Sequence, residues 1–117
     1  MKRFLPLLLA LFLCGFTTVS DNAEKSLENL HRRAEEYMLI SDFEAALSMY
    51  SEILLLEPDD DTAYTGMGKI YLIRGQLRKA HDAFLNALHI HPDNEEAIAG
   101  IKAIMDPDGV EGLVRVD

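Results

Sequence analysis

Four histidines and a short run of aspartates are the residues of this chain best suited to chemistry. An imidazole beside a carboxylate can transfer protons, and histidines grouped with acidic residues can bind a metal ion. His31 stands four residues before Glu35, a spacing that brings two side chains together on one face of a helix. His89 and His91 stand two residues apart at the end of a predicted helix, where their side chains would diverge.

None of these groups completes a catalytic or metal-binding set. Asp59, Asp60 and Asp61 precede a predicted helix, whose dipole favours negative charge there, and a calcium loop would be longer and contain glycine. The chain has no glycine-rich phosphate loop, no zinc-ligand spacing and no alternation of basic and aromatic residues. We therefore expect a protein that is not an enzyme and carries no cofactor or metal. An enzyme or small-ligand binder that uses the His31–Glu35 face is the alternative.

Length and charge limit the fold and the partners. The 117 residues are 26% charged and 49% hydrophobic, which suits one small folded domain. With 11 basic and 20 acidic residues, the net charge of −9 disfavours nucleic acid and anionic lipid as partners. Cys14 is the only cysteine and lies near the N-terminus, so the rest of the chain can form no disulfide and no cysteine-based zinc site.

Residues 1–20 have the pattern of an export signal. Lys2 and Arg3 precede an uncharged apolar run over residues 4–16, and small polar residues follow it. This order is typical of a secretory signal peptide, and the run is shorter than the roughly 20 residues that a membrane-spanning helix needs. We predict cleavage after Ser20 and an exported protein, periplasmic or secreted.

Two other fates of this segment would anchor the protein to a membrane through its N-terminus. Cys14 closes the apolar run, as the cysteine of a bacterial lipoprotein signal does, but Phe12 and Leu13 stand where that signal has small residues. Lipidation of Cys14 is one alternative to cleavage after Ser20. Retention of the uncleaved segment is the other, and all three place the remaining residues outside the cytoplasm.

A 34-residue repeat organises the rest of the chain. Within each copy, apolar residues recur at the three- and four-residue spacing of amphipathic helices. Ser41 with Glu44 predicts a helix start with a capping box, Asp93 with Glu96 predicts another helix start, and Gly75 predicts a helix end. The clearest repeated positions are Tyr37, Ala46, Tyr50 and Pro58, which recur in the second copy as Tyr71, Ala80, Phe84 and Pro92.

On these residues the chain resembles the tetratricopeptide repeat proteins. The second copy carries the family's aromatic, small and proline positions, whereas the first has Arg33 where an apolar residue is usual. The resemblance implies an all-α fold, a short right-handed α-solenoid of two helical hairpins with a C-terminal capping helix. The predicted domain spans residues 21–105, with repeats at 27–60 and 61–94, a capping helix at 93–105, and a docked or free tail at 106–117.

The resemblance also implies a function, because solenoids of this kind bind an extended peptide or a partner helix in a concave groove. Leu39 and Ile73 either line this groove or pack against the neighbouring hairpin. Lys69 is its one basic residue, so Lys69→Glu is expected to spare folding and to change binding to an acidic partner. The groove positions taken from the family are Glu28, His31, Glu35, Met38, Leu39, Thr62, Thr65, Lys69, Leu72, Ile73, Glu96, Ala99 and Ala103.

The resemblance and the export signal together predict a non-catalytic adaptor or assembly factor in the bacterial cell envelope, whose partner is another protein or peptide. A cytosolic co-chaperone is disfavoured, because acidic and small residues such as Glu35 and Gly66 occupy the positions where that subfamily binds a carboxylate. One alternative is a lipidated, pilotin-like protein of secretion or pilus assembly. Another is a self-assembling module, with a homodimer contact through Arg33 and the capping helix.

Overall fold

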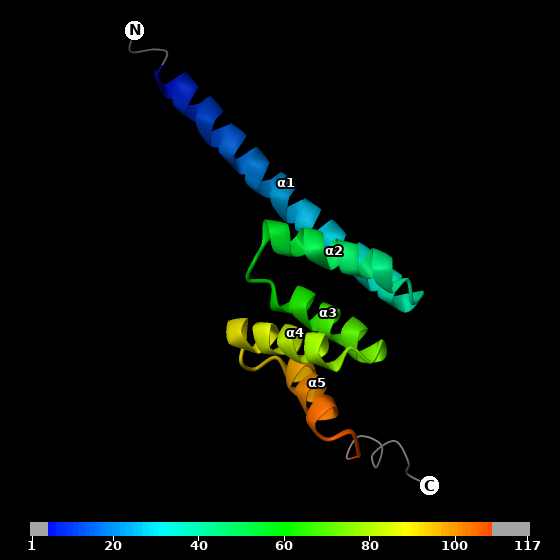
Figure 1. Cartoon of the computed structure of the whole chain (residues 1–117). Coiled ribbons are helices and arrows are strands. Elements are labelled where there is room, and N and C mark those ends of the chain that lie inside the picture. Colours follow the sequence, from blue (N-terminus) through cyan, green and yellow to red (C-terminus); the bar gives the residue numbers. More distant parts are fainter. Residues whose placement is uncertain (1–4, 109–117) are drawn as a thin grey trace.

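The computed structural model describes the backbone of residues 5–108 and the side chains of residues 22–108. Residues 1–4 of the predicted signal, the side chain of Cys14 and residues 109–117 of the predicted tail lie outside the described part. Within that part the predicted all-α fold is confirmed. The helices are α1 (Leu5–Leu39), α2 (Phe43–Leu56), α3 (Asp61–Ile73), α4 (Leu77–Ile90) and α5 (Glu95–Met105) (Figure 1).

The helices stack in chain order as two antiparallel hairpins followed by α5. Helix α1 packs against α2 and α3 against α4, while α2–α3 and α4–α5 contacts join successive units (Figure 1). This arrangement is the predicted helical-repeat solenoid. It builds two neighbouring groups of buried side chains, one centred on α1 and α2 and the other on α4 and α5, and α3 contributes to both.

Helix α1 passes the predicted cleavage position without a break, and its first half extends beyond α2 in Figure 1. Of the side chains described on α1, residues 22–26 are exposed and Leu27 is the first that packs against the core. Among the described helices, none combines the length and the apolar character that crossing a membrane requires.

Small residues allow the helices of each hairpin to approach closely. Ala34, Ala46 and Ala80 have no exposed surface, and Gly68 is buried. The aromatic Phe84 fills the space beside them in the second hairpin, where a Cβ on Gly68 would lie 2.6 Å from its Cε1 atom. These positions carry the 34-residue repeat because they set the distance between paired helices.

Helix α5 carries a long side chain at the position where the two earlier copies have a small residue. Ala34, Gly68 and Lys102 stand at the same position of three successive copies. Ala34 and Gly68 are buried, whereas Lys102 is exposed. In the described part of the chain, a neighbouring helix therefore covers this position in α1 and α3 but not in α5.

Both hairpins turn through the same backbone motif. The amide of Asp42 donates to the carbonyl of Tyr37 at 2.9 Å, and the amide of Gln76 donates to that of Tyr71 at 2.8 Å. These bonds, from the third residue after the helix back to its last turn, define a Schellman motif. Its left-handed residue is Ser41, with a φ of 59°, in the first hairpin and Gly75, with a φ of 73°, in the second.

The predicted first residues of the helix starts, Ser41 and Asp93, are each one position too early. The carboxylate of Asp42, not the hydroxyl of Ser41, accepts from an amide in the first turn of α2. Ser41 cannot cap α2 because it is the left-handed residue of the preceding turn. Asn94, not Asp93, caps α5, and its side chain accepts from the amide of Ala97. The predicted helix end at Gly75 is confirmed.

Ser41→Gly is expected to raise the free energy of unfolding by about 0.5–1 kcal/mol. A left-handed conformation costs a residue with a Cβ roughly 1–2 kcal/mol, and the greater freedom of glycine in the unfolded chain offsets part of that gain. Urea denaturation of the full chain measures the change. Gly75→Ala places a Cβ at the equivalent position and should lower stability by about 1 kcal/mol. A loss of stability in Ser41→Gly, or a gain in Gly75→Ala, would contradict this account of the turns.

Candidate functional site

A groove of about 760 Å³ runs along α1 and α3 to the beginning of α5. It is an open hollow bordered by side chains from every described helix except α4, together with the turn that joins α4 to α5. Its lining residues are His31, Glu35, Met38 and Leu39 of α1, Tyr50 of α2, Thr62, Thr65, Gly66 and Lys69 of α3, His91, Asp93 and Asn94 of the turn, and Glu95 and Glu96 of α5.

The structure brings eight of the predicted groove residues together here. They are His31, Glu35, Met38, Leu39, Thr62, Thr65, Lys69 and Glu96.

Five predicted groove residues lie elsewhere. Glu28 lines a second hollow along α1, which shares His31 and Glu35 with the groove, and Leu72 is half-buried against the core between α3 and α4. Ile73 ends α3 with 61% of its surface exposed, so it neither lines the groove nor packs against a hairpin. Ala99 and Ala103 lie past the groove, because only the first turn of α5 borders it.

Tyr50 was missed as a groove residue because it belongs to α2, the second helix of its hairpin. Its ring reaches the groove across Gly66, where a Cβ would collide with the Cζ and hydroxyl atoms of Tyr50. Gly100 meets Phe84 in the same way one repeat later. The recurrence of this aromatic–glycine pair at the repeat period was a signal in the sequence that could have identified the contact.

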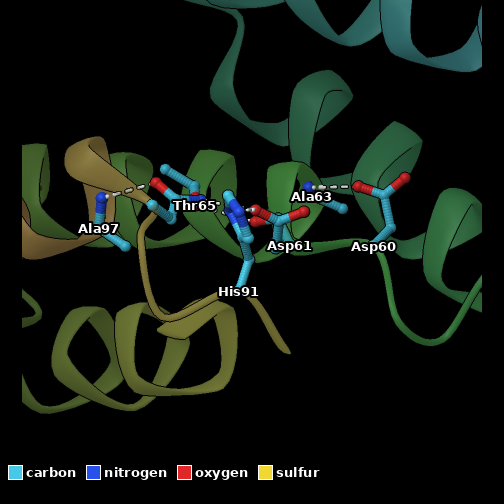
Figure 2. A network of polar contacts seen from close by, with 7 residues as sticks. Asp60, Asp61, Ala63, Thr65, His91 and Ala97 are labelled. Atoms are coloured by element: carbon cyan, nitrogen blue, oxygen red, sulfur yellow. Dashed lines mark hydrogen bonds and ion pairs between the residues drawn. The ribbon is translucent and has the colours of Figure 1, made fainter. Parts of the chain in front are cut away.

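A network of hydrogen bonds joins the two helix starts beside the groove (Figure 2). The side-chain amide of Asn94 donates to Asp61 Oδ2 at 2.8 Å and to Thr65 Oγ1 at 3.0 Å, and Thr65 Oγ1 donates to the carbonyl of Asp61 at 2.8 Å. His91 Nδ1 lies 3.5 Å from Asp61 Oδ2. This network fixes the turn before α5 against α3.

The N-cap residues of α3 and α5 form equivalent contacts with the preceding repeat. Asp60 accepts from the amide of Ala63 through Oδ1, and its Oδ2 lies 2.7 Å from His31 Nε2. Asn94 is the counterpart of Asp60 one repeat later, and it contacts Thr65, the counterpart of His31. Each cap therefore holds its own helix start and fastens it to the first helix of the repeat before it.

Two of the histidines contact aspartates at the beginning of α3. His31 contacts Asp60 rather than Glu35, the partner that its position in the sequence suggested. His91 contacts Asp61, and His89 is exposed on α4 and lines no part of the groove. In the part of the chain that the structure describes, no three histidine, cysteine or acidic residues are grouped so that they could hold a metal ion.

The charge of the groove differs from the expectation that Lys69 offers a free positive charge. Lys69 Nζ forms an ion pair with Glu96 Oε2, across the groove from α3 to α5. Glu35, Asp93 and Glu95 also line the groove and form no ion pair with any described residue. The lining therefore has an excess of negative charge, and the charge of Lys69 is matched by that of Glu96.

The buried phenol of Tyr50 responds to this charge. Burial raises the pKa of Tyr50 above its usual value, and the nearby carboxylates of Glu35 and Glu96 raise it further. Both causes act in the same direction, because each disfavours a phenolate at the floor of the groove.

Tyr50→Phe is expected to weaken the loss of stability at alkaline pH. The folded protein holds the Tyr50 proton more tightly than the unfolded chain does, so this contribution to stability is complete below about pH 10 and is lost as the pH rises through the higher folded pKa. Urea denaturation of both proteins between pH 8 and the alkaline limit of the fold measures it. Parallel stability curves above about pH 10 would contradict it.

Comparison with known protein families matches the part of the chain that follows α1. The model of a family described as tetratricopeptide repeat matches residues 41–104, which is more than half of the chain and extends from the first turn to the end region of α5. No curated protein sequence is a match.

Proposed function

This chain belongs to the tetratricopeptide repeat family, and on that premise we propose that it is an adaptor or assembly factor of the bacterial cell envelope. Repeats of this family are typically non-catalytic modules that bind other proteins or peptides. The occupant of the groove is a peptide or a helix of the partner protein.

The observation that carries this proposal is the open, mixed lining of the groove. Leu39 is 85% exposed at the end of α1, beside half-buried Met38, and charged side chains of three helices follow along the hollow. Exposed apolar side chains beside charged ones are typical of interfaces that form and separate. A groove of this size admits a short extended segment or one face of a helix.

The envelope location rests on residues 1–20, whose basic start, apolar run and small polar end are typical of a secretory signal. Cleavage after Ser20 would shorten α1 and leave intact every described side chain that packs against the core, since the first of these is Leu27. It would also remove Lys2 and Arg3 and make the protein two charges more negative.

Production of the full chain in a Gram-negative host should yield a periplasmic protein that begins at Asp21. N-terminal sequencing and intact mass of the purified protein measure this. Cys14→Ser provides the control, because it leaves a protein cleaved after Ser20 unchanged. A mature protein that begins at a lipid-modified Cys14, or one that retains residues 1–20, would contradict the proposed processing.

Photocrosslinking in cells tests the groove directly. A photoreactive amino acid at Thr62, which is exposed and lines the groove, should crosslink the full chain to a partner protein. The same amino acid at Ser48, which is exposed on α2 outside the groove, should not. Crosslinks of equal yield from both positions, or from Ser48 alone, would contradict the proposal.

A further inference from the structure

We infer that the groove selects a cationic partner, a peptide or helix that presents lysine or arginine next to an apolar side chain. This inference rests on the proposed function and adds the chemistry of the partner to it. It replaces the acidic partner that Lys69 suggested in the sequence.

Three carboxylates line the groove and form no ion pair with a described residue. Glu35 projects from α1 and is exposed, while Asp93 and Glu95 are exposed at the beginning of α5. Lys69 is the only lysine or arginine among the lining residues, and its charge is matched by Glu96. A basic side chain of a partner would therefore find carboxylates that no described residue already pairs.

The groove histidines do not change this balance. His31 Nε2 lies 2.7 Å from Asp60, and His91 Nδ1 lies 3.5 Å from Asp61. A positive charge on either ring is matched by the adjacent aspartate, which lies in or next to the first turn of α3. The three carboxylates of Glu35, Asp93 and Glu95 therefore stay available for a partner.

An apolar surface lies next to the acidic one. Met38 and Leu39 follow Glu35 by three and four residues on α1, so the three side chains share one face of the helix. Leu39 is 85% exposed and Met38 is half-buried. A partner that places a basic and an apolar residue three or four positions apart on a helix would meet both surfaces together.

The pKa of Tyr50, at the floor of the groove, is affected by the same negative charge. Its pKa is raised first by burial and then by Glu35 and Glu96. Carboxylates that disfavour a phenolate at this point favour a cation there.

Two labelled helical peptides of equal length test the inference with the purified full chain. They share the same leucine positions and differ only in four surface positions, which are lysine in one peptide and glutamate in the other. Fluorescence anisotropy should give a Kd for the lysine peptide at least about tenfold lower than for the glutamate peptide, since several charge pairs act together. Equal affinities, a preference for the glutamate peptide, or binding of neither would overturn the inference.

Two matched double variants distinguish the effect of the groove carboxylates on peptide affinity from the effect of the net charge of the protein. Glu35→Gln with Glu95→Gln should raise the Kd of the lysine peptide about fivefold or more. Glu52→Gln with Asp82→Asn removes the same charge from exposed residues outside the groove and should change the Kd less than about twofold. An equal loss in both double variants would overturn the inference. The proposed function is tested independently of the charge of the partner, because it requires only that the Thr62 crosslink to a partner protein forms.

Discussion

Phe84→Ala should lower the free energy of unfolding by about 3–5 kcal/mol, the usual cost of removing a buried aromatic ring. Phe84 has no exposed surface and lies between two helices of different units, facing Gly68 of α3 and Gly100 of α5. Its ring therefore fills space both within its hairpin and between that hairpin and the next unit. Because a domain of this size has a total stability of about 5–15 kcal/mol, much of it would be lost.

Chemical denaturation of the full chain measures this loss, with Leu85→Ala as the matched control. Leu85 is the next residue of α4 and is 46% exposed. Its replacement should cost less than about 1 kcal/mol, since little apolar surface leaves the core. Similar losses for the two variants would show that Phe84 does not hold the two units together.

Gly68→Leu should lower the free energy of unfolding by about 3 kcal/mol, a large share of the stability of a short repeat array. Even a Cβ at this position would lie 2.6 Å from Phe84 Cε1, and the three further carbon atoms of leucine have no free space beside a fully buried ring. Overpacking of this kind typically costs about 1–3 kcal/mol, and an array of two hairpins has few neighbouring units that could compensate. Circular dichroism at rising temperature measures the outcome.

Thr62→Leu is the control for this substitution, because Thr62 lies on the same helix and is exposed. It should retain a cooperative transition close to that of the natural protein. The milder Gly68→Ala adds a second test, since combining it with Phe84→Leu should recover part of the loss if the two side chains compete for one space. A natural melting transition for Gly68→Leu would contradict the packing described for α3 and α4.

The hairpins could be predicted from the sequence because their contacts repeat. Ala34 and Gly68 mark the close approach within each hairpin, and Tyr50 and Phe84 mark the aromatic residues that fill it. These positions recur every 34 residues because each hairpin packs its two helices through equivalent residues. The contacts of Tyr50 with Gly66 and of Phe84 with Gly100 were not predicted, because they depend on how one hairpin stacks on the next.

The N-cap residues of α2 and α5 could not be predicted from residue type alone. Ser41 and Asp42 are both good N-cap residues, and so are Asp93 and Asn94. In the first hairpin the backbone of the turn decides between them, because Ser41 has a φ of 59°. The type of element was therefore predictable, whereas its first residue was set by the backbone of the turn.

The groove-lining residues were predictable on the first helix of each hairpin, and those of the turn before α5 were not. The residues of α1 and α3 that line it were expected from the family pattern, apart from Gly66. Asp93, Asn94 and Glu95 enter it because the Asn94 side chain draws the turn against Asp61 and Thr65. The charge of Lys69 was misjudged for a related reason, since its partner Glu96 comes from a different helix.

The central claim is that partner proteins bind in this groove, and two leucines allow it to be tested most directly. Leu39 lines the groove and is 85% exposed, whereas Leu55 lies outside it on α2 and is 84% exposed. Affinity capture from an envelope extract would compare the natural chain, Leu39→Glu and Leu55→Glu, with captured proteins identified by mass spectrometry. We expect a protein that the natural chain and Leu55→Glu both retain and Leu39→Glu loses. A partner lost with Leu55→Glu but retained by Leu39→Glu would contradict the claim.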